Sequence, residues 1–419
     1  MIKNIQIANY KSIDELEFEL GRINVLIGEN GAGKSNILEA IALAGAAAAN
    51  KLDNEFLTSR GIRVTSPEYM RPAFPKFDAL ATIELRIITK QYKLLVDLTN
   101  HNTAYSKWST QSKITANIQS LIDYIDILTN TNQSEFENLQ TNLCKRELVN
   151  YCTKKGVDKN ITSMTLDISS DNYIDFLSSD PKTMWMMAKI FVKHPLSTNI
   201  QSFLIYSPEN SALRTFQREG QIEPLGINGE GLLKLLSVLS RPEYSDSLNE
   251  IKQSLQILGW FEDLTLTDTD PFAGSRIQIK DRYLDETRRY FDQLSTNEGF
   301  LFLLFYFALF STDLTPKFFA IDNIDASLNP KLCEKLMREL VALAEKHDKQ
   351  VIFTTHNPAI LDGLNLDDDE QRLFVVSRNK NGATRLKRVN KPVTATGERP
   401  TRLSELFLRG VLGGLPKGF

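Results

Sequence analysis

The chain has 419 residues, of which 42% are hydrophobic and 24% are charged, and its formal net charge at pH 7 is −3. This composition is that of a globular protein with room for two or three domains, and the small net charge excludes polyanion binding over the whole surface. Cys144, Cys152 and Cys333 form no C-x-x-C pair, which excludes a disulfide framework and favours a cytoplasmic location. The longest apolar run, residues 299–310, is too short to cross a bilayer, and no basic-then-apolar leader opens the chain, so we expect no membrane partner.

The first half of the chain predicts strands around one helix. Residues 2–7 and 16–27 have the apolar, β-branched enrichment of strands, and a helical stretch, SNILEAIALAGAAAA, begins at Ser35. The segment 79–98 is rich in β-branched residues with polar residues at its centre, which predicts a hairpin. Residues 113–200 mix polar and apolar residues without sustained heptads, and they predict an inserted helical lobe rather than a coiled coil.

The second half of the chain alternates strands with helices. In chain order it predicts a strand at 202–206, a helix at 232–239, a hairpin at 264–280, a buried helix at 299–310, a strand at 318–321, a helix at 331–346, a strand at 351–355 and a hairpin at 373–389. This alternation indicates an α/β core with a parallel sheet. We therefore expect an N-terminal lobe at 1–112, the helical insertion at 113–200 and a C-terminal lobe at 201–419.

One motif predicts nucleotide binding. The stretch GENGAGKS, Gly28–Ser35, matches G-x-x-x-x-G-K-[ST] in full. Glycines suit such a loop because its backbone N–H groups must wrap phosphates at a distance that side chains would obstruct. Lys34 would reach the β- and γ-phosphates, and Ser35 would bring a hydroxyl to Mg²⁺. A glycine turn without a ligand is the alternative, which the strand before the loop and the helix after it disfavour.

Two further strand ends carry polar residues. Asp322 ends the apolar strand FFAI, where a carboxylate would hold Mg²⁺ opposite Ser35. His356 follows two threonines in VIFTTHNP, at the carboxyl end of a parallel strand, which is the edge where α/β proteins bind ligands. We expect His356 to sense the γ-phosphate, with a structural histidine as the alternative.

Charge is unevenly distributed near the end of the sequence. Residues 371–419 contain eleven Lys or Arg and two Glu, a net charge of 11 − 2 = +9, whereas the preceding LDDDE at 366–370 is acidic. A contact for nucleic acid or a protein partner and a merely solvated surface remain equal alternatives.

Five stretches in this order, IxIxNYKSI, GENGAGKSN, SxxNEGF, FFAIDNIDASLNP and TTHNP, resemble the ABC-type ATPase heads of the RecF/SMC/OLD group. More closely, the chain is similar to the stand-alone AAA_15/AAA_21-type ATPases of bacterial defence operons, including the Septu and retron-associated ATPases. The resemblance covers roughly residues 1–45 and 225–419. It implies a P-loop NTPase of ABC-ATPase type, with a mixed sheet, an antiparallel N-terminal β-subdomain and the inserted helical lobe. It also implies ATP and Mg²⁺ as ligands, and a homodimer or higher homo-oligomer that sandwiches ATP between subunits.

Carried over position by position, the resemblance assigns roles to single residues. The ATP-binding Walker A loop and the start of its helix are Gly28, Glu29, Asn30, Gly31, Ala32, Gly33, Lys34, Ser35 and Asn36. Asp322 is the Walker B aspartate, which holds the metal together with Ser35. The D-loop runs from Ala326 to Asn329, and His356 is the switch histidine.

Three positions depart from the family pattern. Asn297 and Gly299 fall on the signature segment that contacts the nucleotide of the other subunit, but Asn297 stands where serine is common, and Ser295 is a competing candidate. No clear Q-loop glutamine is visible, because Gln91 falls in the predicted hairpin turn. Asn323 stands where a catalytic glutamate usually orients the attacking water.

Asn323 separates ATP binding from ATP turnover. An amide takes no proton in the relevant pH range, so its presence would slow hydrolysis by about 10²–10⁴-fold. Asp325, His356 or a partner could orient the water instead, and an introduced substitution at Asn323 is a further alternative.

The sequence therefore predicts an ABC-type ATPase that hydrolyses ATP slowly, dimerises around it and couples nucleotide state to a nuclease or toxin partner, or to DNA, in anti-phage defence. The alternatives are a non-hydrolysing, ATP-locked scaffold that sequesters an effector and a RecF-like DNA-repair ATPase.

Overall fold

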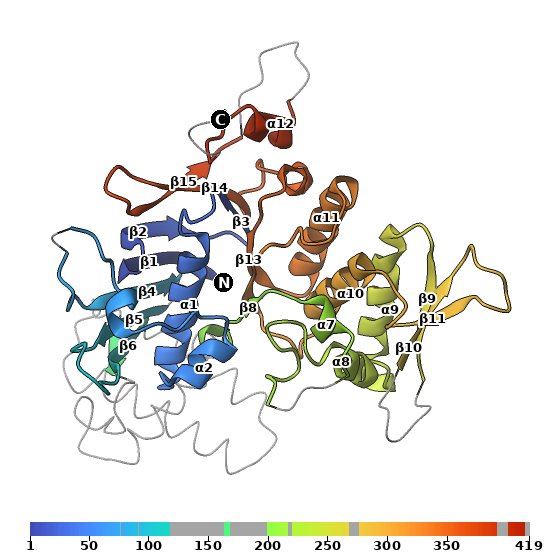
Figure 1. Ribbon diagram of the computed structural model, residues 1–419, viewed down its shortest axis with the longest axis horizontal. Helices are drawn as coiled ribbons and strands as arrows, with labels where there is room; N and C mark the ends of the chain where they lie inside the picture. Colours follow the sequence, from blue (N-terminus) through green and yellow to red (C-terminus); the bar gives the residue numbers. More distant parts are fainter. Residues whose placement is uncertain are drawn as a thin grey trace. The chain divides into compact units, whose positions relative to one another are not determined.

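A computed structural model gives the fold of the chain (Figure 1). It describes residues 1–75, 77–90, 92–117, 163–167, 199–216, 220–267, 276–391 and 401–414. These residues form two compact units. The first comprises 1–19, 40–56 and 64–202, and the second comprises 20–39, 57–63 and 203–419.

The first unit contains a six-stranded antiparallel sheet. Its strands are β1 (Ile2–Tyr10), β2 (Ile13–Glu19), β4 (Ile83–Thr89), β5 (Tyr92–Thr99), β6 (Ser109–Asn117) and β7 (Ser163–Asp167), in the order β2-β1-β4-β5-β6-β7. Every second residue of β5 is buried, from Tyr92 to Leu98, because an antiparallel sheet buries one face and leaves the other partly open. This sheet is the predicted antiparallel N-terminal β-subdomain.

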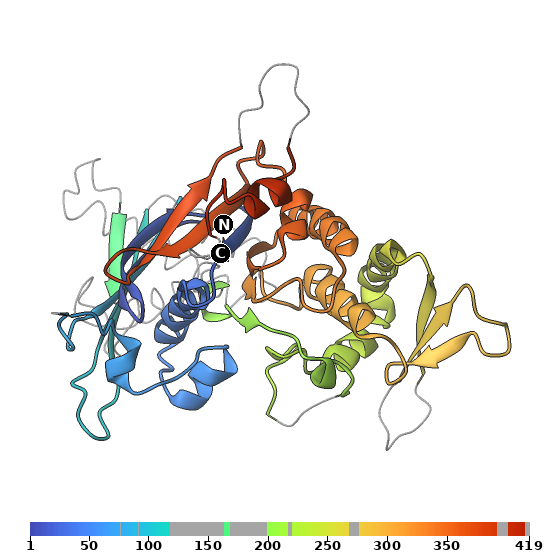
Figure 2. The same cartoon turned by 45° about the horizontal axis from the view of Figure 1, so that its top comes forward.

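The second unit is built on a mixed sheet (Figures 1 and 2). Its strands are β3 (Ile23–Gly28), β8 (Ile205–Tyr206), β12 (Phe318–Ile321), β13 (Gln350–Thr354), β14 (Gln371–Arg378) and β15 (Thr384–Val389), in the order β15-β14-β3-β13-β12-β8. All neighbours are parallel except β14 and β15. Every residue of β3, β12 and β13 is buried, which explains why these strands are continuous apolar runs in the sequence.

Helices and a small sheet complete the chain. The helices are α1 (Lys34–Ala48), α2 (Asn54–Ser59), α7 (Asn210–Leu213), α8 (Leu232–Leu239), α9 (Ser245–Ser254), α10 (Glu298–Phe310), α11 (Pro330–Lys346) and α12 (Leu403–Leu408). The strands β9 (Phe261–Thr267), β10 (Arg276–Asp281) and β11 (Tyr290–Asp292) form an antiparallel sheet in the second unit. Helix α10 contacts α7, α8, α9 and α11, and all its residues from Phe300 to Phe310 are buried, so the predicted fully buried helix is confirmed.

Two expectations about local structure differ from the fold. The strand predicted over 16–27 is two strands in different sheets, because the chain breaks at Gly21. A Cβ there would lie 2.5 Å from the carbonyl oxygen of Glu370, and the Asn24 side chain bonds both the N–H and the C=O of Gly21. Within the region predicted to be helical, the described residues 113–117 and 163–167 are strand; the rest of 113–198 lies outside the described residues. Gln91 also lies outside them.

Candidate nucleotide-binding site

The phosphate loop connects β3 to α1 in the second unit. Gly28, Gly31 and Gly33 have φ angles of 152°, 76° and 110°, which residues with a side chain rarely adopt. A Cβ on Gly28 would also lie 2.1 Å from the carbonyl oxygen of Val376 on the neighbouring β14. The rim of the loop at Asn30 and Gly31 is exposed. The glycines therefore serve both the turn of the backbone and its close contact with the sheet.

Lys34 is folded back over this loop. Its side chain is 7% exposed, and its Nζ donates to the carbonyl oxygens of Gly28 at 2.8 Å and Glu29 at 3.1 Å. Burial lowers the pKa of Lys34 below its ordinary value, while the nearby Asp322 carboxylate raises it. A buried ammonium that is bonded only to carbonyl groups gains strongly from an anion, because a charged acceptor offsets more of its desolvation.

Asp322 joins three elements at the carboxyl edge of the sheet. Its two carboxylate oxygens accept hydrogen bonds from the hydroxyls of Ser35, at 3.3 Å, and of Thr354. Its backbone N–H donates to the carbonyl of Tyr206 on β8 at 2.8 Å. Ser35 and Asp322 are far apart in sequence, and the fold brings them together because β3 and β12 flank β13.

This oxygen pair fits a magnesium ion. Neighbouring ligands of an octahedral Mg²⁺ at about 2.1 Å are roughly 3.0 Å apart, close to the observed distance of 3.3 Å between Ser35 Oγ and Asp322 Oδ2. A hydroxyl and a carboxylate are also the hard oxygen donors that this ion prefers. The described part of the chain contains no group of three or more His, Cys, Asp or Glu that could hold a metal ion. Ser35 and Asp322 are thus the residues that would hold Mg²⁺.

Asn323 has an unusual backbone conformation. Its φ angle is +55°, its N–H donates to the Thr354 hydroxyl at 2.9 Å, and its carbonyl accepts from Ala326 N–H at 3.1 Å. The left-handed region costs most residues about 1–2 kcal/mol, and asparagine tolerates it better than glutamate does. Its side chain is exposed and hydrogen-bonds to no described residue. The backbone at this position thus gives a structural reason for asparagine.

His356 lies directly beyond β13, next to the same groups. Its pKa is lowered because part of the ring is removed from water and because of the Lys34 charge, while Asp325 and Asp322 oppose this effect. The side chain is exposed, so the imidazole can reach a ligand. Asp325 is more constrained, since one of its carboxylate oxygens accepts a hydrogen bond from the Thr355 hydroxyl.

A family model for AAA ATPase domains matches residues 1–361. The chain belongs to this family. Among its relatives, the DNA replication and repair protein RecF from Clostridioides difficile is 33% identical over 97 residues, 22% of this chain and 24% of RecF. The OLD nuclease from Thermus scotoductus is 40% identical over 43 residues, 10% of this chain and 8% of the nuclease. The chain therefore aligns with a quarter or less of the length of these relatives.

The fold agrees with this assignment. A crystal structure of an SMC head bound to the C-winged helix domain of ScpA has a TM-score of 0.50 at 14% identity, over 93% of this chain and 98% of that chain. The chain is thus a member of the AAA ATPase domain family with an α/β P-loop fold, similar in sequence to parts of RecF and the OLD nuclease and in fold to an SMC head. No helix among its described residues is long and apolar enough to cross a membrane.

The predicted signature segment lies at the start of α10. Asn297 is the N-cap of the helix, and its side-chain oxygen accepts from the N–H of Phe300 at 2.9 Å. Its exposed side-chain N–H₂ group has no acceptor among the described residues. The competing Ser295 instead donates its hydroxyl to Asp292 at 3.0 Å. Asn297 therefore has the more available polar group of the two candidates.

The predicted signature segment lies close to the predicted D-loop. A Cβ on Gly299 would lie 3.3 Å from the carbonyl oxygen of Ser327, so the glycine allows this close approach. Ser327 itself has a φ angle of +59°, and the turn around it is closed by the bond from Leu328 N–H to the Asp325 carbonyl, at 3.3 Å. Neither Asn297 nor Gly299 hydrogen-bonds to the phosphate loop within the described chain. The fold thus brings Lys34, Ser35, Asp322 and His356 together.

Several residues around this ATPase site were not predicted. Thr354 and Thr355 stand in the TTHNP stretch, where the polar strand end is the only signal for their bonds to Asp322 and Asp325. Arg378 on β14 donates its Nε to the Gly31 carbonyl at 2.8 Å, and Thr384 donates to the Ala32 carbonyl at 3.0 Å. No local sequence pattern predicts the contacts of Arg378 and Thr384, because they connect distant parts of the sequence.

Arg214 and Arg63 hold two further segments. Arg214 donates to the carbonyl groups of residues 293, 294 and 296, in the loop that precedes the signature helix. Arg63 bonds the side chains of Asn36 and Glu39 on the first turns of α1. Asn36, expected at the nucleotide, is therefore held by Arg63 in this structure. Arg214 thus holds backbone before α10, whereas Arg63 holds side chains on α1.

Proposed function

We propose that the protein binds Mg-ATP at Gly28–Ser35 and hydrolyses it slowly. The observation that carries this proposal is the group formed by Lys34, Ser35, Asp322 and Thr354, which combines a buried ammonium with a hydroxyl–carboxylate pair spaced for Mg²⁺. The metal would neutralise charge on the β- and γ-phosphates. Phosphoryl transfer depends mainly on such charge stabilisation and positioning, so the site contains most of what the reaction requires.

Slow turnover follows from the residues that face the γ-phosphate position. Asn323 cannot take a proton, and its left-handed backbone would strain a glutamate. Asp325 has one oxygen committed to Thr355. His356 has a lowered pKa and is therefore mostly neutral at pH 7, so it can accept a hydrogen bond from water. We assign it to orienting the attacking water and sensing the γ-phosphate.

We further propose that two copies close around ATP, with the signature segment of one copy facing the nucleotide of the other. The side-chain N–H₂ of Asn297 is exposed at a helix N-terminus, where N–H groups and the helix dipole favour phosphate. This arrangement explains why the segment makes no hydrogen bond to the phosphate loop of its own chain. Nucleotide-dependent closure would then control a nuclease or toxin partner in anti-phage defence, a role suggested by the resemblance to defence ATPases.

Binding and closure are tested together. Lys34→Ala should abolish ATP binding in calorimetry, because the buried ammonium is lost, whereas Asn297→Ala should keep ATP binding but lose the ATP-dependent dimer in light scattering. Unchanged ATP affinity in Lys34→Ala would refute the site itself. If the wild-type protein stays monomeric with ATP, the proposed dimer is refuted.

For the cellular role, expression of the gene with its neighbours should protect cells against phage in a plaque assay, and Lys34→Ala should remove that protection.

A non-hydrolysing, ATP-locked scaffold is the second candidate. The exposed amide of Asn323, in place of a catalytic base, favours it. It predicts that ATP stays intact over hours under all conditions while the dimer persists.

A RecF-like role at DNA is the third candidate, and it would involve the basic residues of the β14–β15 hairpin. Asp369 pairs with both Arg372 and Arg388, and Asp367 pairs with Lys391. Lys380, Arg385 and Lys387 are exposed, so any DNA contact there should be weak and salt-sensitive.

A further inference from the structure

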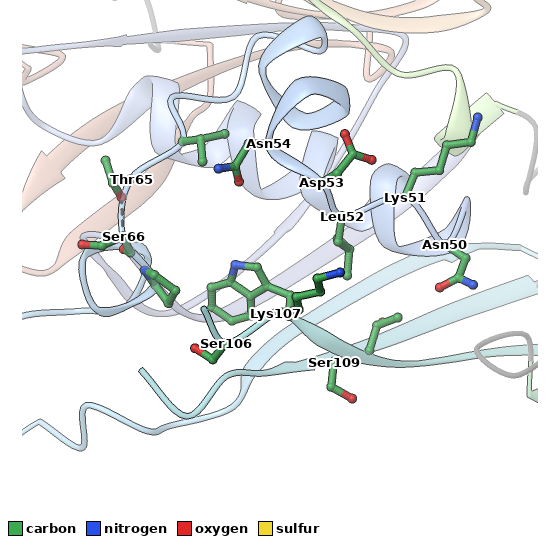
Figure 3. Close-up of a pocket in the computed structure, with 14 residues that line it drawn as sticks. Asn50, Lys51, Leu52, Asp53, Asn54, Thr65, Ser66, Ser106, Lys107 and Ser109 are labelled. Atoms are coloured by element: carbon green, nitrogen blue, oxygen red, sulfur yellow. Dashed lines mark hydrogen bonds between the residues drawn. The ribbon is translucent and has the colours of Figure 1, made fainter. Parts of the chain in front are cut away.

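The first unit contains a polar cavity that the ATPase reaction does not use. Its volume is about 980 Å³, and it is formed by the end of α1, the start of α2 and two loops (Figure 3). The lining residues are Asn50, Lys51, Leu52, Asp53, Asn54, Val64, Thr65, Ser66, Pro67, Ser106, Lys107, Trp108, Ser109 and Thr110. None of them belongs to the phosphate loop. The volume is in the range of pockets that bind small organic ligands.

Trp108 is the aromatic residue among those that line this cavity. It is backed by Arg71, whose guanidinium carbon lies 5.0 Å from the ring centroid. Arg71 is only 1% exposed and is fixed by three hydrogen bonds, to the carbonyls of Ala81 at 2.7 Å and Asn100 at 2.9 Å and to the Asn102 side chain at 2.9 Å. A rigid, buried guanidinium thus holds one ring face, and the indole is presented to the cavity in a fixed orientation.

The charged groups of the wall favour an anion. Lys51 and Lys107 are exposed residues of the wall, and the Nζ of Lys51 lies 5.1 Å from the centroid of the Phe56 ring. Asp53 is the acidic residue among the lining side chains. One carboxylate oxygen of Asp53 accepts from the N–H of Phe56, so that carboxylate is engaged in capping α2. The remaining wall offers hydroxyl and amide groups, which can both donate and accept hydrogen bonds.

A flat aromatic platform, small polar groups and two lysines together match one ligand chemistry. Bases stack on aromatic rings, hydroxyl and amide groups bond base edges, and lysines pair with phosphate. We propose that this cavity binds a nucleotide unit, with its base stacked on Trp108 and its phosphate at Lys51 and Lys107. The unit is either a free mononucleotide or one residue of single-stranded nucleic acid. This site is separate from the Walker A site and does not depend on it.

The test uses the full chain with Lys34→Ala, so that the phosphate loop contributes no nucleotide binding. Fluorescein-labelled oligo-dT measured by anisotropy and AMP measured by calorimetry distinguish the strand from the free nucleotide, and binding of either supports the site. Trp108→Ala should weaken binding by about 5- to 150-fold, because a stacked base contributes 1–3 kcal/mol. Trp108→Phe should restore most of it. Tyr105→Ala is the control, since this side chain is fully exposed and does not line the cavity.

The lysines provide an independent arm. The double variant Lys51→Ala, Lys107→Ala should bind more weakly, and its binding should depend less on salt. The proposal fails if neither probe binds, if Trp108→Ala binds as the parent does with an unchanged circular dichroism spectrum, or if the lysine variant keeps the full salt dependence. ATP binding by Trp108→Ala with Lys34 intact reports on the ATPase site alone, so failure of one site is distinguishable from failure of the other.

Discussion

Replacing Asn323 with glutamate tests whether the residue after the Walker B aspartate limits turnover. The residue has a φ angle of +55°, where a glutamate costs about 1 kcal/mol more than asparagine. For a unit of this size, that cost lowers the melting temperature by about 2–4 °C. The glutamate also restores a general base, which raises the rate of such a reaction by about 10²–10⁴-fold. The glutamate variant should therefore be slightly less stable and much faster.

Asn323→Gln is the matched control. Glutamine has the length of glutamate and the same backbone strain, but its amide takes no proton. It should lose the same 2–4 °C in differential scanning fluorimetry and show no gain in turnover. Asn323→Gly relieves the strain instead, so it should melt at or above the wild-type temperature and remain slow.

Single-turnover hydrolysis of [γ-³²P]ATP with protein in excess measures the chemical step directly. The reasoning is refuted if the glutamate variant gains less than about tenfold over wild type, or if the glutamine variant gains as much as the glutamate variant. Either result would mean that the attacking water is oriented from Asp325, His356 or a partner, and that Asn323 is chosen only for its backbone.

Three further predictions follow from single contacts. Asp322→Asn keeps an acceptor for Thr354 but loses the charge, so the Mg²⁺ dependence of ATP binding should weaken by about 10- to 100-fold, while binding without Mg²⁺, measured by calorimetry in EDTA, should be almost unchanged. Arg214→Ala removes the donors that hold the loop before α10, and should cost about 1–3 kcal/mol and speed hydrogen exchange over residues 293–297; Arg214→Lys should not restore protection, because it lacks the planar fork. Burial and the Asp325 charge raise the pKa of Cys333 to about 12, so its alkylation by iodoacetamide at pH 8 should be about 10³-fold slower in the native protein than in guanidinium; a comparable rate in both would contradict this burial.

Much of the candidate site could be predicted from sequence, because its residues lie in short stretches whose patterns are visible without the fold. The glycines and Lys34 are set by one loop, and Asp322 and His356 each end an apolar strand, so their type and position are readable without the fold. Asn297 was assigned by resemblance, and its role as the N-cap of α10 is also local. Arg214 was not predictable, since the loop that it holds lies far along the chain and an arginine pattern says nothing of its partner.

The alternation of strands and helices was predicted from the sequence. The prediction was wrong where a single residue determines the local structure. The run over 16–27 looks like one strand, and only the approach of Glu370 to Gly21 divides it. The strands β6 and β7 lie in a region whose mixed composition suggests helices, because their hydrophobic alternation is weak and their stability comes from pairing with β5 and with each other.

The place of β3 in its sheet has a consequence for how the polypeptide matures. Its two neighbours, β13 and β14, come much later in the sequence, so the strand that carries the phosphate loop remains unpaired until both have been synthesised. A fragment cut at residue 361, where the family match ends, would retain Walker A, Asp322 and His356 and still leave one edge of β3 bare. Bare edges recruit other chains, so such a fragment should aggregate although its motifs are complete. Expression without aggregation should therefore need β14, which lies beyond the family match and pairs with β3.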